Sequence, residues 1–304
     1  MWQPEPGWQP LPGGLGPTTA GVWRAEVAGR LVVVKRLVPA PDLAHDEPGL
    51  ADPRHFAYWR RAADVVTAAT VVETPGLRSA GLGAVDEDED GITITLEWVE
   101  DASNSGLFCA HAMGQFAGAH LAAAPWLGRN QLRDRLVRVE RYGGWQTLAR
   151  TTVADVADHL WSRRVELLAA VDALVQVPQH GDAVPANLLG RDGDDLVAID
   201  WGTLGTGPVG GDLGYFALSA REELEPLIDA YLLGMPDGLA TRDEVTLGAR
   251  VTAVYTVLNR AEWALARAAR GEGALAGKFR HPAVAPHLRA LQRQFPHIEA
   301  LVEG

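Results

Sequence analysis

The stretch HGDAVPANLLGRDGDDLVAIDWG, residues 180–202, constrains this chain more than any other feature of its sequence. It places Asp182, Asn187 and Asp200 at set spacings between apolar runs. Asp200 directly follows the apolar run 196–199, which is typical of a short strand, and the glycine that follows Trp201 allows a sharp turn. The three polar side chains are therefore expected to lie where loops meet strands. The alternative interpretation is an acidic hairpin without a chemical role.

These polar groups suit phosphoryl transfer. A carboxylate such as Asp182 can accept the hydrogen bond of an acceptor hydroxyl and, late in the reaction, its proton. The side-chain oxygen of Asn187 is a hard ligand of the kind that Mg²⁺ prefers. A carboxylate at the end of a strand, as Asp200 is expected to be, can reach a metal ion that bridges two phosphates. The stretch therefore predicts a catalytic carboxylate beside a magnesium site.

A lysine in the N-terminal part of the chain is the second candidate for phosphate chemistry. Residues 22–27 and 31–37 are rich in β-formers and predict a hairpin. In the second strand Lys35 shares a face with Val33 and Leu37. A lysine on an apolar face is well placed to pair with phosphate oxygens. The alternative is a lysine that extends from an edge strand into water.

A glycine-rich turn, LPGGLGPTTAGVW at 11–23, precedes that lysine. Gly14 and Gly16 would let backbone amides approach a phosphate closely, and Thr18 and Thr19 add hydroxyl groups. The alternative is a flexible N-terminal loop.

More strands and one helix are expected before residue 100. The segments 77–85 and 92–99 predict a second strand pair, joined by the acidic tip at 86–91. A helix over 54–69 is expected between the two pairs, with Asp52-Pro53 as its N-cap and first helical residue. The acidic tip is interpreted as a solvated turn, because its consecutive carboxylates lack the spacing of a calcium loop.

The remaining two thirds of the chain predict mostly helices, with a candidate hinge at 97–101. We therefore expect an N-terminal lobe over 1–99 and a C-terminal lobe over 100–304. Short strands are expected near 188–189 and 196–199. The expected helices are 105–123, 151–175, 212–220, 222–233, 243–270 and 284–295.

Composition excludes several classes of protein. The net charge of −12 argues against nucleic-acid binding as the main function, and no apolar stretch is long enough for a membrane span. The start of the chain does not resemble a secretory signal. A single cysteine, Cys109, cannot form an intramolecular disulfide, which fits a protein of the reducing cytoplasm. We expect Cys109 to be a buried apolar residue. We expect a monomer or a homodimer.

Acidic residues concentrate in one segment. Residues 181–244 contain thirteen Asp and Glu against three Arg, whereas residues 245–304 contain eight Lys and Arg against four Glu. The acidic segment is either solvated helix surface or a field that attracts metal ions and cationic substrates. As candidate partners of a cationic substrate we name Glu222, Asp229, Glu262 and, as a stacking face, Trp263.

The segment 180–213 resembles the catalytic core of the aminoglycoside phosphotransferase family, which shares the protein-kinase fold. That family typically carries His-Gly-Asp, four residues, Asn, a short hairpin and Ile-Asp-Trp or Ile-Asp-Phe. An Asp-Leu pair usually follows, and this chain has Gly211-Asp212-Leu213. The resemblance implies an α+β fold of two lobes, a small β-rich N-terminal lobe that binds nucleotide and a larger helical C-terminal lobe for catalysis and substrate binding.

The resemblance also implies roles for individual residues. It makes Asp182 the catalytic base and assigns Mg²⁺ to Asn187 and Asp200. Lys35 would bind the α- and β-phosphates of ATP. The resemblance also implies that His180 and Asp212 support the catalytic loop. It further implies that the backbone from Glu97 to Val99 contacts adenine.

The sequence departs from the family at the partner of the lysine. The family pairs that lysine with a Glu on the next helix, but Arg54 and His55 stand where one is sought here. Glu47 or Asp52, from the preceding loop, are the substitutes that the sequence offers.

The expected activity is ATP- and Mg²⁺-dependent phosphorylation of a hydroxyl on a small, amine-bearing molecule, such as an aminoglycoside, aminosugar or amino alcohol. The segment between Asp200 and Asp212 is short and is not followed by Ala-Pro-Glu, which disfavours a protein substrate. A non-catalytic, nucleotide-binding pseudokinase scaffold is the alternative function, and the missing helix Glu is its main support.

Overall fold

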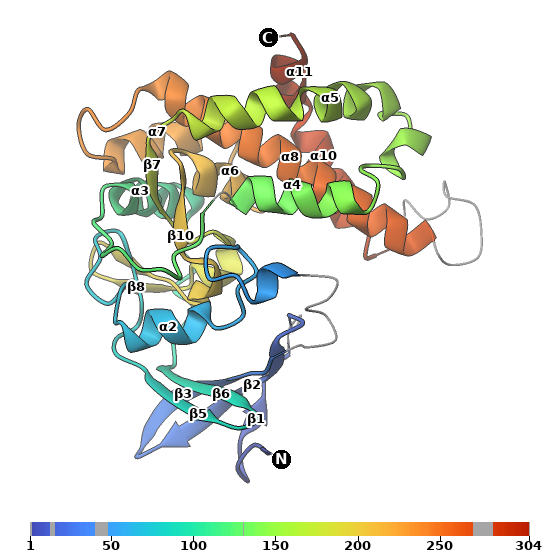
Figure 1. Ribbon diagram of the computed structural model, residues 1–304. Coiled ribbons are helices and arrows are strands. Elements are labelled where there is room, and N and C mark those ends of the chain that lie inside the picture. The colour runs from blue at the N-terminus through green and yellow to red at the C-terminus, as the bar shows by residue number, and fades with distance from the viewer. Residues whose placement is uncertain (1, 13–15, 40–47, 130, 270–281, 304) are drawn as a thin grey trace.

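The N-terminal part of the chain forms a five-stranded antiparallel sheet in the order β1-β2-β3-β6-β5 (Figure 1). The computed structural model describes residues 2–12, 16–39, 48–129, 131–269 and 282–303. The strands predicted at 22–27, 31–37 and 92–99 are confirmed. The sheet consists of β1 (Gln9–Pro10), β2 (Thr19–Val27), β3 (Arg30–Leu37), β5 (Ala84–Asp88) and β6 (Gly91–Glu97).

The register of the sheet puts Lys35 at its centre. Lys35 on β3 lies opposite Val22 on β2 and Ile94 on β6. β-Branched and other apolar residues dominate these strands, as a half-buried pleated surface requires. The other candidate location of this lysine, an edge strand, is therefore wrong, because β3 has a hydrogen-bonded neighbour on each side.

The C-terminal part is mainly helical, and its helices bury two apolar clusters. One cluster joins α3, α6 and α7, and the other joins α4, α5, α8, α10 and α11. In Figure 1 these helices lie at the opposite end of the molecule from the sheet. The helices are α3 (Gly106–Ala117), α4 (Gln131–Arg141), α5 (Ala154–Asp172), α6 (Gly211–Ala217), α7 (Leu224–Gly234), α8 (Arg242–Ala269), α10 (Ala285–Arg293) and α11 (Phe295–Glu303).

Short strands hold both sides of the segment that contains the polar motif. Before it, β7 (Gln176–Gln179) pairs with β10 (Gly205–Pro208), which follows it. Within it, β8 (Gly190–Asp192) and β9 (Asp195–Val197) form the short hairpin. A strand from the N-terminal third, β4 (Leu77–Arg78), pairs with β9 in parallel. The motif is thus fixed between two small sheets.

Several expected boundaries are wrong. The strand expected at 77–85 is split into β4 and β5, because its first residues pair with β9 instead of with β6. The helix expected at 105–123 ends at Ala117. The helix expected at 284–295 ends at Arg293, and α11 follows it. The expected elements did not include α4, β7 or β10. None of the described helices is long and apolar enough to cross a bilayer.

The helix expected over 54–69 is also shorter, because α2 spans only Arg61–Thr67. Asp52 does not cap it; its carboxylate accepts the backbone N–H of Arg54 at 2.9 Å within a turn. The turn residues before α2 do not continue the helix, since their carbonyl groups are bound by the side chain of Arg61. That side chain is completely buried. It donates hydrogen bonds of 2.6–3.2 Å to the carbonyls of Pro53, His55, Phe56, Trp126 and Gly202.

Arg61 therefore joins three distant parts of the chain through one guanidinium. It connects the turns before α2 with Trp126 and with Gly202, the last residue of the polar motif at 180–202. Burial lowers the pKa of Arg61 to about 10, so the group stays charged at neutral pH. A buried charge is tolerated only when its donors are satisfied, and here five carbonyl groups satisfy them.

Replacing Arg61 by Met should lower the free energy of unfolding by about 3–5 kcal/mol, because buried carbonyls lose their donors. Chemical denaturation followed by circular dichroism measures this loss. Arg60→Met is the matched control, since Arg60 is adjacent but pairs with the exposed Glu87. Equal losses in both variants would contradict the anchoring role of Arg61.

Candidate active site

Lys35 and Asp200 meet although 165 positions separate them in the chain. Lys35 Nζ lies 2.7 Å from Asp200 Oδ1. Asp200 has left-handed backbone angles (φ 59°, ψ 58°) at the start of the turn Trp201–Thr203, a conformation that Asp tolerates better than most residues. Burial raises the pKa of the Asp200 carboxyl, but the nearby Lys35 ammonium outweighs it and holds the pKa below its usual value. Asp200 is therefore ionised at neutral pH.

A cavity of about 400 Å³ opens around this ion pair. The sheet contributes apolar walls through Val22, Val33 and Ile94, and the polar motif contributes Asn187 and Ile199. The segment after β6, residues 97–99, forms another wall. An apolar cavity with a few convergent charged groups is typical of a small-molecule site.

The cavity brings together the predicted metal ligands. Ile199 donates its backbone N–H to the carbonyl oxygen of Asn187 at 2.8 Å, which places Asn187 beside the strand end that carries Asp200. Both side chains line the cavity with Lys35. Among the residues that the structure describes, no group of three or more His, Cys, Asp or Glu side chains is arranged to hold a metal ion.

Asp182 is held by two side chains. The Asn187 amide donates to the Asp182 carbonyl oxygen at 2.9 Å and to its Oδ2 at 3.1 Å. The hydroxyl of Tyr215 donates to Oδ1 at 2.7 Å. Both carboxylate oxygens therefore have a donor, and the orientation of Asp182 is set. Tyr215 is not among the residues expected from the sequence, although its position three residues after Asp212 on α6 puts the two on one helix face.

Asp212 and His180 hold the backbone on which Asp182 stands. The buried Asp212 carboxylate accepts the N–H groups of His180 at 2.6 Å and Gly181 at 3.0 Å. The His180 ring contacts Ile199 O through Nε2 at 2.8 Å, and its Nδ1 accepts the Asp182 N–H at 3.3 Å. Nε2 is therefore the ring nitrogen that donates to the Ile199 carbonyl oxygen. The contacts connect the Asp182 loop with the Asp200 strand.

Burial raises the pKa of Asp212, although His180 and the two backbone donors act against that rise. Gly181 is required between these groups for two reasons. Its φ is +81°, and a Cβ there would lie 2.3 Å from the Gln131 side chain and 2.5 Å from Thr203 O. The tight loop around Asp182 is thus specific for glycine at this position.

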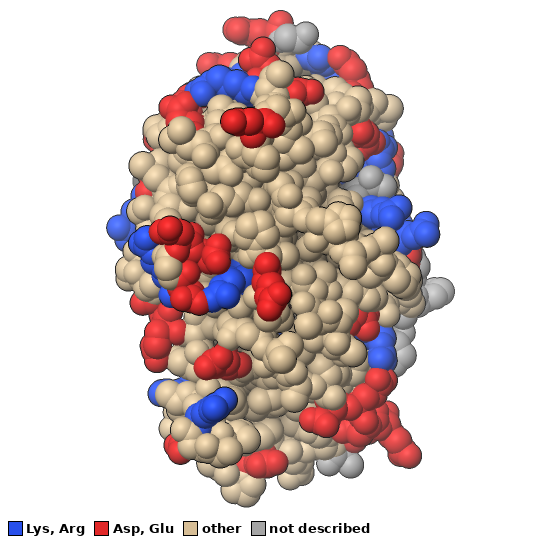
Figure 2. Space-filling model, turned by 90° about the vertical axis from the view of Figure 1, so that its left-hand side faces the viewer, with Lys and Arg blue, Asp and Glu red and all other residues tan. Residues whose placement is uncertain are grey.

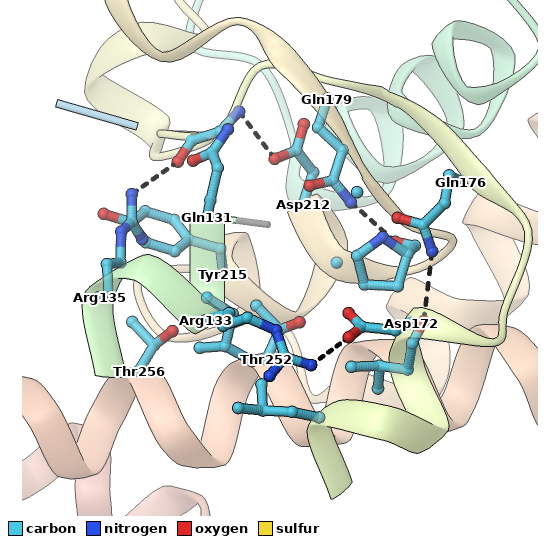
Figure 3. A pocket seen from close by; sticks show the side chains of 17 residues that line it. Gln131, Arg133, Arg135, Asp172, Gln176, Gln179, Asp212, Tyr215, Thr252 and Thr256 are labelled. Atoms are coloured by element: carbon cyan, nitrogen blue, oxygen red, sulfur yellow. Dashed lines mark hydrogen bonds and ion pairs between the residues drawn. The ribbon is translucent and has the colours of Figure 1, made fainter. Parts of the chain in front are cut away.

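Helix α4 packs against the other side of this loop (Figure 3). Arg135 donates to the Gly181 carbonyl at 3.1 Å, and Gln131 donates to the Thr203 carbonyl at 2.7 Å. The space beneath is small, about 40 Å³, and contains the hydroxyl of Thr256, which has no protein partner. That volume is too small to enclose a whole substrate. The sequence analysis missed α4 and both of these residues.

The glycine-rich turn is described only in part. Gly14 lies outside the described residues. The carbonyl oxygens of Gly16 and Thr18 accept the backbone N–H groups of Thr19 at 3.0 Å and Val38 at 2.9 Å, respectively. None of Gly16, Thr18 and Thr19 is among the described residues that line the 400 Å³ cavity. Their role in phosphate binding stays a prediction.

The substitutes proposed for the missing helix Glu can be placed only in part. Glu47 lies outside the described residues. The Asp52 carboxylate accepts from the Arg54 backbone. Within the described chain, the ion pair of Lys35 is with Asp200 and with no residue of α2.

The proposed substrate carboxylates have other partners. Asp229 pairs with Arg242 at 2.6 Å. Glu262 accepts the backbone N–H groups of Thr147 and Leu148 at 2.8–3.0 Å. Figure 2 shows that acidic and basic side chains alternate on one face of the molecule, around a broad uncharged area. The acidic excess of residues 181–244 is therefore partly neutralised locally.

The other two substrate candidates also have protein contacts. Glu222 accepts the Gly106 N–H at 2.9 Å, at the start of α3. Trp263 is 56% exposed and stacks with Arg267 at 5.3 Å. Asp229, Glu262 and Trp263 line neither the 400 Å³ cavity nor the 40 Å³ space, as far as the described residues show, whereas Glu222 lines a separate cavity of about 680 Å³ with Pro185 and Ala186. Their role in substrate binding stays a prediction that these contacts do not favour.

A sequence comparison and a structure comparison extend this picture. The model of a family described as "Phosphotransferase enzyme family" matches residues 8–245. No curated protein sequence matches the chain significantly.

Several solved structures are similar over nearly the whole chain. A choline/ethanolamine kinase family protein from Mesorhizobium loti has a TM-score of 0.55 at 18% identity, covering 98% of this chain and 92% of its own. Choline kinase from Streptococcus pneumoniae has a TM-score of 0.56 at 13% identity, covering 95% of this chain and 92% of its own. Spectinomycin phosphotransferase, solved with ADP and spectinomycin, has a TM-score of 0.54 at 12% identity, covering 95% of this chain and 92% of its own. The expected α+β, protein-kinase-like fold is thereby confirmed.

Replacing Asp212 by Asn should lower the free energy of unfolding by about 1–3 kcal/mol, because the amide NH₂ cannot accept one of the two backbone N–H groups. Denaturation measures the loss, and faster amide hydrogen exchange at Gly181 localises it. The matched control is Asp229→Asn on the exposed α7 pair. A variant as stable and as protected as the parent would show that Asp212 does not hold the loop.

Proposed function

This chain belongs to the phosphotransferase enzyme family, and from that premise we propose that it transfers the γ-phosphoryl group of ATP, with Mg²⁺, to a hydroxyl of a small molecule. The family resemblance of residues 180–213 is confirmed by the match, and the chain is a phosphotransferase. ATP, Mg²⁺ and the roles of single residues belong to the proposal.

The contact between Lys35 and Asp200 is the observation that carries the proposal. It joins the sheet to the polar motif, and the same cavity contains Asn187. Asp182 follows directly, because Asn187 donates to its carboxylate at 3.1 Å. Four residues that the sequence nominated separately are thus neighbours, as phosphoryl transfer between a nucleotide and a hydroxyl requires.

The residues fit both groups that the reaction needs. The cavity has apolar walls for a base, and the backbone at Glu97–Val99 lies at its edge. Asn187 and Asp200 supply an amide oxygen and a carboxylate, and Mg²⁺ usually takes only one or two protein carboxylates beside phosphate oxygens. When bound, Mg²⁺ neutralises phosphate charge. Lys35 adds a further positive charge at the same place.

Asp182 would act on the acceptor. The acceptor oxygen bonds to the γ-phosphorus as the bond to the β-phosphate oxygen breaks, and the hydroxyl proton passes to Asp182. Tyr215 and Asn187 fix the carboxylate beforehand, so little reorganisation is needed at the moment of reaction. His180 and Asp212 act through the backbone and are positioning residues.

The small size of the acceptor is supported by the short segment after Asp200, which forms β10 and leads directly into α6. Similar proteins are described as kinases of choline and of spectinomycin, which are small molecules. An amine on the acceptor was expected from the acidic segment, and that expectation loses its main support with the contacts of Asp229 and Glu262. We propose the cytoplasm as the compartment, because the chain has a single cysteine. That the protein is a monomer or a homodimer stays a prediction.

A non-catalytic scaffold is the second candidate. Its support is α2, whose single acidic residue is Asp64 and which offers Lys35 no carboxylate partner among the described residues. The ion pair with Asp200 weighs against it, because Lys35 is already oriented toward the cavity without such a partner.

Replacing Asp182 by Asn should lower turnover by about 10²–10⁴-fold, because an amide cannot take the hydroxyl proton. The affinity for MgATP should stay within about threefold of the parent value. ATP consumption with a panel of hydroxyl compounds and calorimetric nucleotide titration measure the two effects. Unchanged turnover would remove Asp182 from its role, and absence of MgATP binding by the parent protein would overturn the proposed function.

Replacing Asp200 by Asn should weaken MgATP binding at least about tenfold, a loss already typical of changes around metal ligands. Binding of ATP without metal should change little. Titrations with and without Mg²⁺ separate the two. Asp194→Asn, in the exposed turn between β8 and β9, is the control. A metal dependence equal to that of the control would contradict the assignment.

A further inference from the structure

Two arginines from different helices stack on the tyrosine that holds the proposed catalytic base. The guanidinium of Arg135 on α4 lies 5.0 Å from the ring centroid of Tyr215, and that of Arg260 on α8 lies 4.4 Å from it. Tyr215 in turn donates to Asp182 at 2.7 Å. Two positive charges therefore stand within one side chain of the residue expected to meet the acceptor hydroxyl.

Neither arginine is neutralised by a carboxylate of the described chain. Arg135 donates one hydrogen bond, to the Gly181 carbonyl. Arg260 has no ion pair or hydrogen bond with a carboxylate of the described residues; it stacks on Tyr215, and burial together with the Arg260 charge lowers the pKa of the nearby His287. Both side chains are partly exposed. Several other arginines of the C-terminal helices, in contrast, have carboxylate partners, such as Arg133, Arg164 and Arg242.

The carboxylates of the neighbouring elements are already engaged elsewhere. Asp172 pairs with Arg133, and Asp134 lies 4.0 Å from His55. Glu262, on the same helix as Arg260, caps the backbone at 147–148. Asp212 is buried against the loop backbone. Among the described residues, Asp182 is therefore the one carboxylate in direct contact with Tyr215, and it stands beside two arginines that have no ion pair with it.

We infer that the acceptor carries an anionic group, a carboxylate or a phosphate, which binds Arg135 and Arg260 while its hydroxyl approaches Asp182. This inference rests on the proposed function of the site. A guanidinium is the side chain best suited to such groups, because its donors match two oxygens at once. A cationic acceptor would be repelled by the same pair of charges. The negative net charge of the chain does not decide this, because many of its acidic residues pair with arginines or backbone amides away from Tyr215.

The pair also explains why Tyr215 and not a carboxylate restrains Asp182. A neutral hydroxyl holds the base without adding charge, so the arginines stay free to meet an anion. Arg260 is the sharper probe of the two, since Arg135 also donates to the loop carbonyl and its loss would disturb Asp182 directly.

The test uses two series of acceptors matched in size, each offered with MgATP to the full-length protein. One series is glucose, glucosamine, glucuronate and glucose 6-phosphate. The other is 1,4-butanediol, 4-aminobutanol and 4-hydroxybutyrate. We expect the anionic members to be phosphorylated with the highest kcat/KM, and the two anionic sugars distinguish carboxylate from phosphate. Preference for the neutral or ammonium members would overturn the inference.

Arg260→Gln should raise the KM of an anionic acceptor about 10–100-fold, the loss of a charge-assisted contact, with kcat within about threefold. The KM of its neutral counterpart should change by less than about twofold. Arg260→Lys should recover part of the loss. Arg267→Gln is the matched control, because Arg267 lies on the same helix and also stacks on an aromatic ring, that of Trp263. Equal effects on anionic and neutral acceptors would show a purely structural role.

A binding measurement separates this inference from the proposed function. Malonate, titrated into the MgADP complex and into the nucleotide-free protein, should bind saturably, and Arg260→Gln should abolish that binding while Arg267→Gln retains it. Malonate binding to a protein that does not bind MgATP would support the anion site and refute the kinase. MgATP turnover without malonate binding or anion preference would refute the anion site alone.

Discussion

The site depends on one buried carboxylate that holds two backbone amides. Asp212 accepts the N–H groups of His180 and Gly181, the two residues immediately before Asp182. A charge in a dry interior is costly unless hydrogen bonds satisfy it, so the loop that supplies those donors has a single favourable position. From that position His180 reaches Ile199, the residue immediately before Asp200, and so fixes the backbone that carries Asp200. The positions of Asp182 and Asp200 are consequences of this arrangement.

A second buried charge performs the corresponding task at the other end of the stretch 180–202. Arg61 uses its guanidinium to bind carbonyl groups of the turns before α2, of Trp126 and of Gly202. The carboxylate collects donors and the guanidinium collects acceptors, and both use the backbone. The polar motif is therefore held from both ends by side chains that take no part in the proposed chemistry. Such contacts leave Lys35, Asn187 and Asp200 free to face the cavity.

The distribution of charge around the proposed base differs from the composition of the chain. The net charge is −12, yet the residues stacked around Tyr215 are two arginines without carboxylate partners among the described residues. The acidic side chains of α7 and α8 instead bind arginines or backbone amides nearby. Short-range pairs determine the local potential more than a sum over the chain does, because salt screens exposed charges beyond about 10 Å. An electrostatic argument about the substrate therefore has to begin at Asp182.

The sequence by itself determined the spacing and order of the chemistry. Local patterns predicted strands β2, β3 and β6, and the motif of residues 180–202 predicted Asp182, Asn187 and Asp200 as site residues, since both signals depend on near neighbours. Tertiary structure alone decided the partner of Lys35, the start of α2 at Arg61 instead of at residue 54, and the stack of Arg135 and Arg260 on Tyr215. These contacts join residues that lie far apart along the chain. Hydrophobic periodicity and local preference depend on near neighbours, so they cannot predict which distant groups meet in the folded protein.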